Sequence, residues 1–217
     1  MGADVERVFA SGGVSTGLGI VAGIAAIAYL WLTEAPTSTR RTVIKATPLL
    51  AFAAIAALSG APVLLVVALV LSAVGDVALS RDGQRAFLVG LVAFAIAHLG
   101  YLAVFAPRVL QWQFAPIIVL AGAGFLAILK VIPKRDPLTW PARAYAVIIC
   151  LMTAAAVSLP VGLRVAALGA VLFLLSDLIL AIRMFHLKEG SPRSRLASYV
   201  LWVFYVGGQG LILFAFL

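Results

Sequence analysis

The chain has 217 residues, of which 64 % are apolar and only 11 % are charged, and its mean hydropathy is +1.16. A soluble domain is about half apolar and about a quarter charged, so the composition excludes an ordinary soluble protein and indicates one built within a lipid bilayer. The net charge of +8 does not indicate a nucleic-acid partner, because the basic residues are distributed among the loops between apolar segments.

Eight apolar segments follow one another along the chain. Each is close to the length of about 20 residues that a helix needs to cross a bilayer, and the continuous apolar runs favour helices over the alternating strands of a barrel. We therefore expect an all-α fold, a polytopic transmembrane helical bundle that forms a single integral membrane domain over residues 1–217. The second segment is expected to be the shortest, ending at the turn signal Ser59-Gly60-Ala61-Pro62. The predicted spans cover about residues 14–32, 45–60, 62–80, 86–106, 114–132, 143–160, 164–183 and 198–217.

The basic residues are distributed very unevenly between the two sets of loops. Thirteen of the 16 Lys and Arg residues flank the loops after the first, third, fifth and seventh spans, and only Arg7, Arg108 and Arg164 lie on the other side. Basic loops stay in the cytoplasm. This asymmetry predicts cytoplasmic basic loops, both termini outside, a location in the cell inner membrane and contacts with anionic membrane lipids.

Two aspartates lie within the predicted spans. Asp76 is in the third and Asp177 in the seventh, and each follows a small residue, Gly75 or Ser176. An ionisable group at membrane depth is costly and usually functional, although a hydrogen-bonded clamp between helices is the alternative for either residue alone. The matching positions predict one shared site and suggest a 4+4 parallel repeat.

Polar side chains on the same spans share the helix faces of this expected site. Ser72 lies four residues before Asp76, and Tyr205 lies four residues before Gln209, so each pair occupies one face of a helix. Tyr145 lies near the same membrane boundary. These groups are expected to surround one polar cavity in the cytoplasmic half.

The fourth span contributes His98 and Tyr101. A histidine satisfied by a neighbouring carbonyl, or a tyrosine that only packs, is as compatible with this sequence as a role in the site.

Several chemistries have no motif in this chain. There is no His-Glu-x-x-His pattern and no Cys/His cluster, so neither a metal nor another cofactor is expected. The single cysteine, Cys150, excludes an internal disulfide. Two buried carboxyl groups close together do not both ionise easily, so one is expected to keep its proton. The pair would then supply a general acid and a general base.

Six stretches in chain order carry a family resemblance. They are Lys45-Ala46-Thr47-Pro48, Ser72-Ala73-Val74-Gly75-Asp76, Ala97-His98-Leu99-Gly100-Tyr101, Tyr145-Ala146-Val147-Ile148, Phe173-Leu174-Leu175-Ser176-Asp177, and Tyr205 with Gln209. In this order they resemble the YhhN-like family, the lysoplasmalogenases. One departure is Phe204, which stands before Tyr205 where the family tends to have a second tyrosine.

The resemblance implies an ether hydrolase without a cofactor, whose partner is a lysophospholipid substrate with a vinyl-ether chain. Its products would be a fatty aldehyde and glycerophosphoethanolamine or glycerophosphocholine. Catalysis would fall to Asp76 and Asp177, one protonating the vinyl carbon and the other stabilising the cation and activating water. Basic side chains are suited to the phosphate. The candidate substrate-binding residues are Lys45, Ser72, His98, Tyr101, Tyr145, Ser176, Arg183, Tyr205 and Gln209.

Other classes of membrane protein remain as alternatives. Paired aspartates also occur in intramembrane aspartyl proteases, but Asp177 follows Asp76 by 101 residues, and in Ala73-Val74-Gly75-Asp76 an alanine replaces the first glycine of the Gly-x-Gly-Asp pattern. A proton-coupled transporter would suit a 4+4 repeat and predicts flux without bond cleavage. A purely structural protein predicts that aspartate substitutions change stability alone. The sequence makes no prediction of an oligomeric state.

Overall fold

The computed structural model describes residues 2–134 and 136–217, and within these ranges it contains helices and turns but no strand. This confirms the predicted all-α bundle. The helices are α1 Gly2–Leu30, α2 Thr39–Leu58, α3 Val63–Leu79, α4 Gln84–Phe105, α5 Phe114–Pro116, α6 Ala123–Val131, α7 Thr139–Val157, α8 Arg164–His186 and α9 Pro192–Phe214, with a π-helical segment Ile117–Gly122 between α5 and α6.

All eight predicted apolar segments are helical. Within the described ranges, seven helical segments are long and apolar enough to cross a membrane, and the eighth, α3, is a shorter apolar helix of 17 residues. The prediction that the second segment is the shortest was wrong. Helix α2 begins earlier than expected because Ser38 caps its first turn, accepting a hydrogen bond from the Arg41 amide at 3.2 Å.

The turn between α2 and α3 forms at the predicted position. Gly60 has a φ of +70°, a left-handed conformation that glycine adopts without a steric penalty. Ser59 ends α2, and Pro62 immediately precedes α3. The tight connection makes these two helices antiparallel neighbours.

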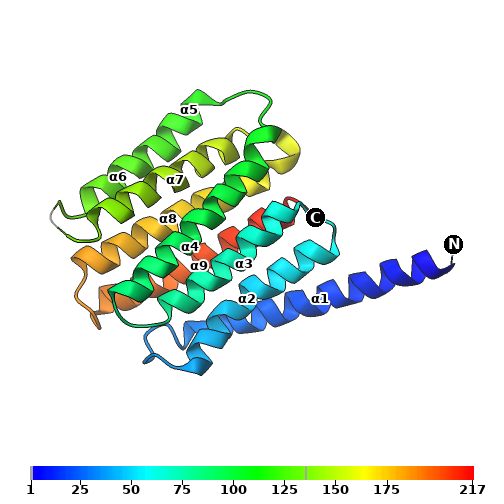
Figure 1. Cartoon of the computed structure of the whole chain (residues 1–217), viewed down its shortest axis with the longest axis horizontal. Coiled ribbons are helices and arrows are strands. Elements are labelled where there is room, and N and C mark those ends of the chain that lie inside the picture. Colours follow the sequence, from blue (N-terminus) through cyan, green and yellow to red (C-terminus); the bar gives the residue numbers. More distant parts are fainter. Residues whose placement is uncertain (1, 135) are drawn as a thin grey trace.

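The helices alternate in direction, so the loops divide between two ends of the bundle (Figure 1). The loops α1–α2, α3–α4, α6–α7 and α8–α9, which carry most of the basic residues, lie at one end. The other loops, the start of α1 and the C-terminus lie at the opposite end. Arg135, one of the thirteen basic residues, lies outside the described residues. The orientation of these ends in a membrane stays a prediction.

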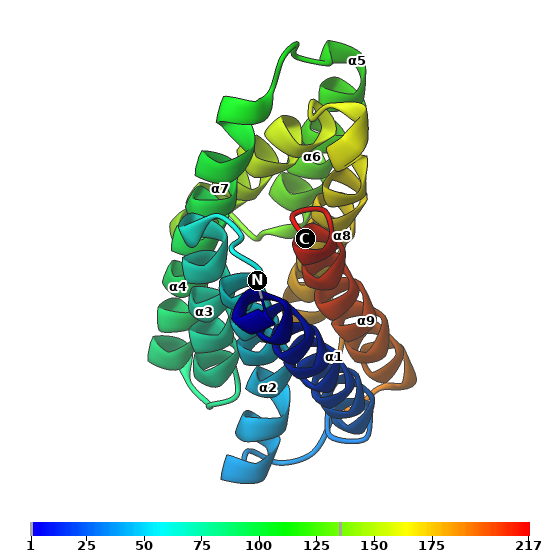
Figure 2. The same ribbon diagram turned by 90° about the vertical axis from the view of Figure 1, so that its right-hand side faces the viewer.

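Helices α8 and α9 approach each other closely at two glycines. A Cβ added at Gly169 would lie 2.6 Å from the Gly208 carbonyl oxygen, and one added at Gly208 would lie 2.7 Å from the Gly169 oxygen. Only glycine permits such backbone contact between helices. Figure 2 shows α8 and α9 side by side, with α6 and α1 toward opposite edges of the bundle.

Helices α3 and α4 also pack through small residues. A Cβ at Gly75 would lie 2.6 Å from the Phe94 ring. The ring can therefore pack against α3 at this position only because the residue before Asp76 has no side chain. The pairing of α3 with α4 matches that of α8 with α9 in chain order. Both aspartate-bearing helices are therefore held by the helix that follows them. The 4+4 repeat itself stays a prediction.

Candidate active site

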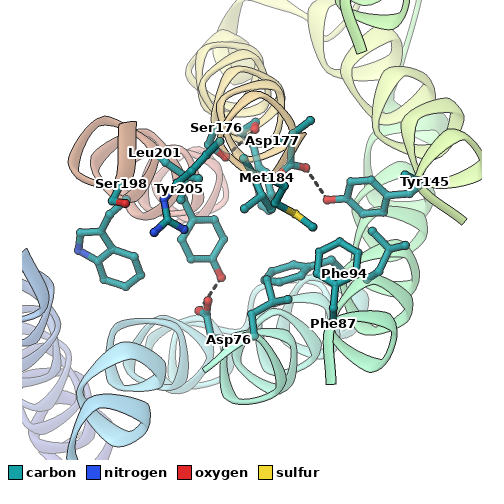
Figure 3. A pocket seen from close by; sticks show the side chains of 18 of the residues that line it. Asp76, Phe87, Phe94, Tyr145, Ser176, Asp177, Met184, Ser198, Leu201 and Tyr205 are labelled. Atoms are coloured by element: carbon teal, nitrogen blue, oxygen red, sulfur yellow. Dashed lines mark hydrogen bonds between the residues drawn. The ribbon is translucent and has the colours of Figure 1, made fainter. Parts of the chain in front are cut away.

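A cavity of about 310 Å³ lies at the end of the bundle where the basic loops gather. Residues from α1, α2, α3, α4, α6, α7, α8 and α9 line it. Much of its wall is apolar and aromatic, with Phe87, Phe94 and Phe173 among the lining residues. Asp76 and Asp177 line the same cavity, and Figure 3 shows them projecting from different helices.

Asp76 is held by one cation and one hydroxyl group. It is 1 % exposed, on the buried face of α3 that also carries Ser72 and Ser80. The Lys45 Nζ from α2 lies 3.1 Å from Oδ1, and the Tyr205 hydroxyl from α9 donates to Oδ2 at 2.7 Å. Two consecutive helices, α2 and α3, and the distant α9 therefore meet at this carboxylate, which has a full counter-charge beside it.

Asp177 has a different set of partners. The Tyr145 hydroxyl from α7 donates to its Oδ2 (Figure 3). Within residues 12–134 and 136–217, no Lys or Arg forms an ion pair with this carboxyl group. The two aspartates thus share one cavity and one kind of phenolic donor, but only Asp76 has a cation.

Most of the predicted site residues line the cavity. They come from α2, α3, α7, α8 and α9 and are Lys45, Asp76, Tyr145, Ser176, Asp177, Arg183 and Tyr205. These residues could be grouped from the sequence because each falls near the same end of its predicted span. The fixed rise per residue of a helix then gives them all a similar depth in the membrane.

Four predicted substrate-binding residues do not line the cavity, and their role in binding substrate stays a prediction. Ser72 and Gln209 are joined by a hydrogen bond of 3.0 Å from Nε2 to Oγ, and the Tyr101 hydroxyl donates to Gln209 Oε1. All three are fully buried, as is His98. Ser72 lies one helical turn away from Asp76, so this layer sits behind the cavity.

His98 has one ring nitrogen satisfied by the backbone. Its Nδ1 lies 2.5 Å from the Phe94 carbonyl oxygen, and because a carbonyl only accepts, this nitrogen carries the hydrogen. Among the described residues Nε2 has no hydrogen-bond partner. The ring packs against Phe173 and Tyr145, with centroids 4.5 and 5.4 Å away. His98 therefore supports the wall that holds the Tyr145 phenol.

Sequence reasoning missed several polar groups of the cavity. Arg41 lines it, donating from Nε to the Leu32 carbonyl oxygen at 3.0 Å and from a terminal nitrogen to that of Thr33 at 3.2 Å. Its guanidinium group also lies 5.8 Å from the centre of the Tyr29 ring. In the sequence Arg41 was one of many loop cations, and nothing local distinguished it from Arg40.

A second polar network lies at the rim. A terminal guanidinium nitrogen of Arg183 lies 2.9 Å from Glu34 Oε1, and its Nε donates to Ser194 Oγ at 3.2 Å. The Ser198 hydroxyl donates to the same Glu34 oxygen at 2.5 Å. In the sequence Glu34 carries no local signal of this network, because its partners Arg183 and Ser198 are 149 and 164 residues away in the chain.

Within the described part of the chain, no three His, Cys, Asp or Glu side chains come close enough together to hold a metal ion. The chemistry available to the cavity residues themselves is proton transfer by carboxyl and phenol groups, and binding of a negative group by Arg41, Lys45 and Arg183.

Comparison of the sequence with known proteins identifies relatives of this chain. The sequence profile of the YhhN family matches residues 40–216, which hold every lining residue except two from α1 and its following turn. The chain belongs to the YhhN family. It is also 33 % identical over 188 residues to a Homo sapiens protein named lysoplasmalogenase TMEM86B, covering 84 % of this chain and 78 % of that protein. No solved structure matches the chain. With its apolar helices, this YhhN-family protein is an integral membrane protein.

Proposed function

We propose that this protein is a lysoplasmalogenase, which hydrolyses the vinyl-ether bond of a lysoplasmalogen to a fatty aldehyde and glycerophosphoethanolamine or glycerophosphocholine. The relative named lysoplasmalogenase supports this reaction class. The observation that carries the proposal is the pair of aspartates on one cavity, of which Asp76 has the cation Lys45 as a partner and Asp177 has the phenol of Tyr145.

In this proposal the two aspartates take different roles, acid and anion, because their hydrogen-bond and ion-pair partners differ. The Lys45 ammonium 3.1 Å from Asp76 favours the ionised carboxylate there. Asp177 shares the cavity with that negative charge and has no such cation in the described part of the chain. Two carboxyl groups in one site keep one proton between them most easily. We therefore assign the acid to Asp177 and the fixed anion to Asp76.

The reaction then proceeds in balanced steps. The Asp177 proton passes to the β-carbon of the vinyl ether, whose double-bond electrons form the new C–H bond and leave an oxocarbenium ion at the α-carbon. The Asp76 carboxylate stabilises this cation. Water adds to the α-carbon and its proton restores Asp177. The resulting hemiacetal breaks its bond to the glycerol oxygen as its hydroxyl proton moves there, which releases the aldehyde and the glycerophospho-compound. Paired carboxylates serve glycosidases in a similar way.

The walls of the cavity suit a single-chain lipid with a phosphate. Aromatic and aliphatic side chains such as Phe87, Phe94 and Leu201 provide an apolar surface for the hydrocarbon. Arg41, Lys45 and Arg183 line the same space, and a guanidinium or ammonium group binds a phosphate by charge-assisted hydrogen bonds. The proposal places the head group toward the basic loops, on the cytoplasmic side of an inner membrane.

The test uses the purified full chain in nanodiscs. It is incubated with a vinyl-ether lysolipid and with the saturated ether lysolipid of the same head group, and aldehyde release is measured. Aldehyde from the vinyl-ether lipid alone is expected, because the saturated chain has no double bond to protonate. Absence of aldehyde from the vinyl-ether lipid with a folded protein, or movement of intact lipid without cleavage in sealed vesicles, would favour a transporter and refute the hydrolase.

A further inference from the structure

Beside the cavity lies an ion pair that the proposed reaction steps do not use: Arg183 lines the cavity, and Glu34 contacts Arg183 and Ser198 from just outside the lining. Glu34 lies in the turn after α1, and Arg183 lies near the end of α8. Their side chains are 24 % and 29 % exposed, in contrast to 12 % and 2 % for Lys45 and Asp76. The outer pair can therefore exchange its partners for a ligand more readily than the inner one.

Glu34 is held in place by contacts between α1 and α9. The Trp202 indole N–H donates to the Ala26 carbonyl oxygen at 2.8 Å, and the Trp202 and Tyr29 ring centroids are 4.3 Å apart. These contacts fix the end of α1 four residues before Glu34, and the Ser198 hydroxyl then holds its carboxylate at 2.5 Å. The acidic group at the rim is thus positioned by the fold.

The three cations of the cavity differ in their partners. Arg41 donates to the backbone carbonyl oxygens of Leu32 and Thr33, and Lys45 pairs with the buried Asp76. Arg183 alone among these three pairs with a carboxylate at the solvent-exposed rim. A phosphate that reaches Arg183 would release Glu34, whose negative charge then needs a new positive partner.

We propose that Glu34 and Arg183 separate to receive a zwitterionic head group, with its phosphate on Arg183 and its ammonium group on Glu34. This deepens, and rests on, the proposed function. Before binding, Glu34 and Arg183 neutralise each other; after binding, the ammonium group neutralises Glu34 and the phosphate neutralises Arg183. No charge is therefore left without an opposite partner. A head group with the same phosphate but no amine would leave Glu34 unpaired beside a negative group, a repulsive arrangement. Glu34 is then the residue that selects amine-bearing lysolipids.

The experiment measures binding without turnover. Saturated ether lysolipids with phosphoethanolamine, phosphocholine or phosphoglycerol head groups are titrated against the full chain in nanodiscs, with tryptophan fluorescence as the readout because Trp202 lines the cavity. We expect the wild-type protein to bind the two amine lipids about three- to tenfold more tightly than the phosphoglycerol lipid, the scale of a partly exposed charge pair.

Two variants separate the charge from general effects. Glu34→Gln should remove most of the preference by weakening the amine lipids, and Arg183→Gln should weaken all three. Glu189→Gln, an exposed carboxyl in the α8–α9 loop at the same end of the bundle, is the matched control and should bind as the wild type does.

Three results would overturn the selection by Glu34. The first is equal binding of the three lipids by the wild-type protein, which needs no variant to fold. The second is a folded Glu34→Gln protein that keeps the full preference. The third is a Glu34→Gln protein that binds all three lipids more tightly, which would make Glu34 a mere competitor for Arg183. Because the lipids are uncleavable, any of these is distinguishable from a failure of hydrolysis, which the aldehyde assay reports separately.

Discussion

Lys45 and Asp76 form an ion pair between α2 and α3, with Nζ 3.1 Å from Oδ1 and side chains that are only 12 % and 2 % exposed. A charge pair this deep depends on both members, because removal of one leaves the other without compensation. Lys45 therefore belongs to the machinery around the aspartate as well as to the proposed phosphate site. A substitution at Lys45 is therefore expected to lower the stability of the protein as well as its binding of phosphate.

Replacement of Lys45 by methionine should destabilise the protein by about 3–5 kcal/mol, the usual cost of breaking a buried pair. The double variant Lys45→Met/Asp76→Asn should recover part of that loss, because neither charge remains. Thermal denaturation of the single and double variants in one detergent gives the coupling as a double-mutant cycle. Additive effects of the two substitutions would show that the pair contributes nothing to stability.

Asp177→Asn and Asp76→Asn should each lower the rate of aldehyde release at least roughly a hundredfold, the scale of lost acid-base catalysis. Asparagine keeps the shape of the side chain, so Asp177→Asn should leave the denaturation temperature nearly unchanged. Asp82→Asn is the control, because Asp82 lies in the α3–α4 loop, bonded to Thr37, and does not line the cavity. Near-normal aldehyde release from either folded variant would refute the paired-acid mechanism.

Tyr145→Phe removes the phenol that donates to Asp177 Oδ2. If Tyr145 positions the acid, kcat should fall about ten- to a hundredfold while KM changes little, because the loss is felt mainly in the transition state. Tyr199→Phe removes a hydroxyl from a tyrosine that is 41 % exposed and does not line the cavity, and it should keep wild-type kinetics. An effect of Tyr145→Phe confined to KM would instead assign Tyr145 to substrate binding.

Gly208→Ala should destabilise the bundle by about 1–3 kcal/mol, the cost of overpacking a close interface, because its new Cβ would lie 2.7 Å from the Gly169 oxygen. The neighbouring Gly207 offers a matched control. A Cβ there meets nothing within 4 Å, so Gly207→Ala should be neutral or stabilising by up to about 1 kcal/mol through helix propensity. Thermal denaturation compares the two, and equal effects would contradict the close packing of α8 on α9.

The basic loops should face the cytoplasm and both termini the opposite side. The test replaces Cys150 with alanine and introduces single cysteines in the α3–α4 loop and at the C-terminus. A membrane-impermeant thiol reagent applied to intact cells should label the C-terminal cysteine and leave the loop cysteine unmodified until the cells are opened. The reverse pattern would invert the predicted topology.

The order and approximate limits of the apolar helical segments could be predicted from the sequence. A bilayer requires a continuous apolar run of nearly fixed length in each helix, so composition alone marks the segments. The buried face of α3 was also predictable, because Ser72, Asp76 and Ser80 recur at helical spacing and are all buried. For the same reason the sequence indicated that Asp76 and Asp177 lie at similar depths.

Only the tertiary structure decided which polar groups meet. Glu34 follows α1 in the chain, yet its contacts with Arg183 and Ser198, two residues that line the cavity, depend on the packing of α1 against α9. Arg41, in the first turn of α2, lines the cavity while it bonds the carbonyl oxygens that follow α1. Gln209 and Tyr101 share helix faces with candidate site residues but bond each other behind the cavity. Helix periodicity fixes the depth of a side chain and the face it occupies, whereas the rotation and tilt that aim this face at one neighbour rather than another follow from the packing of the whole bundle.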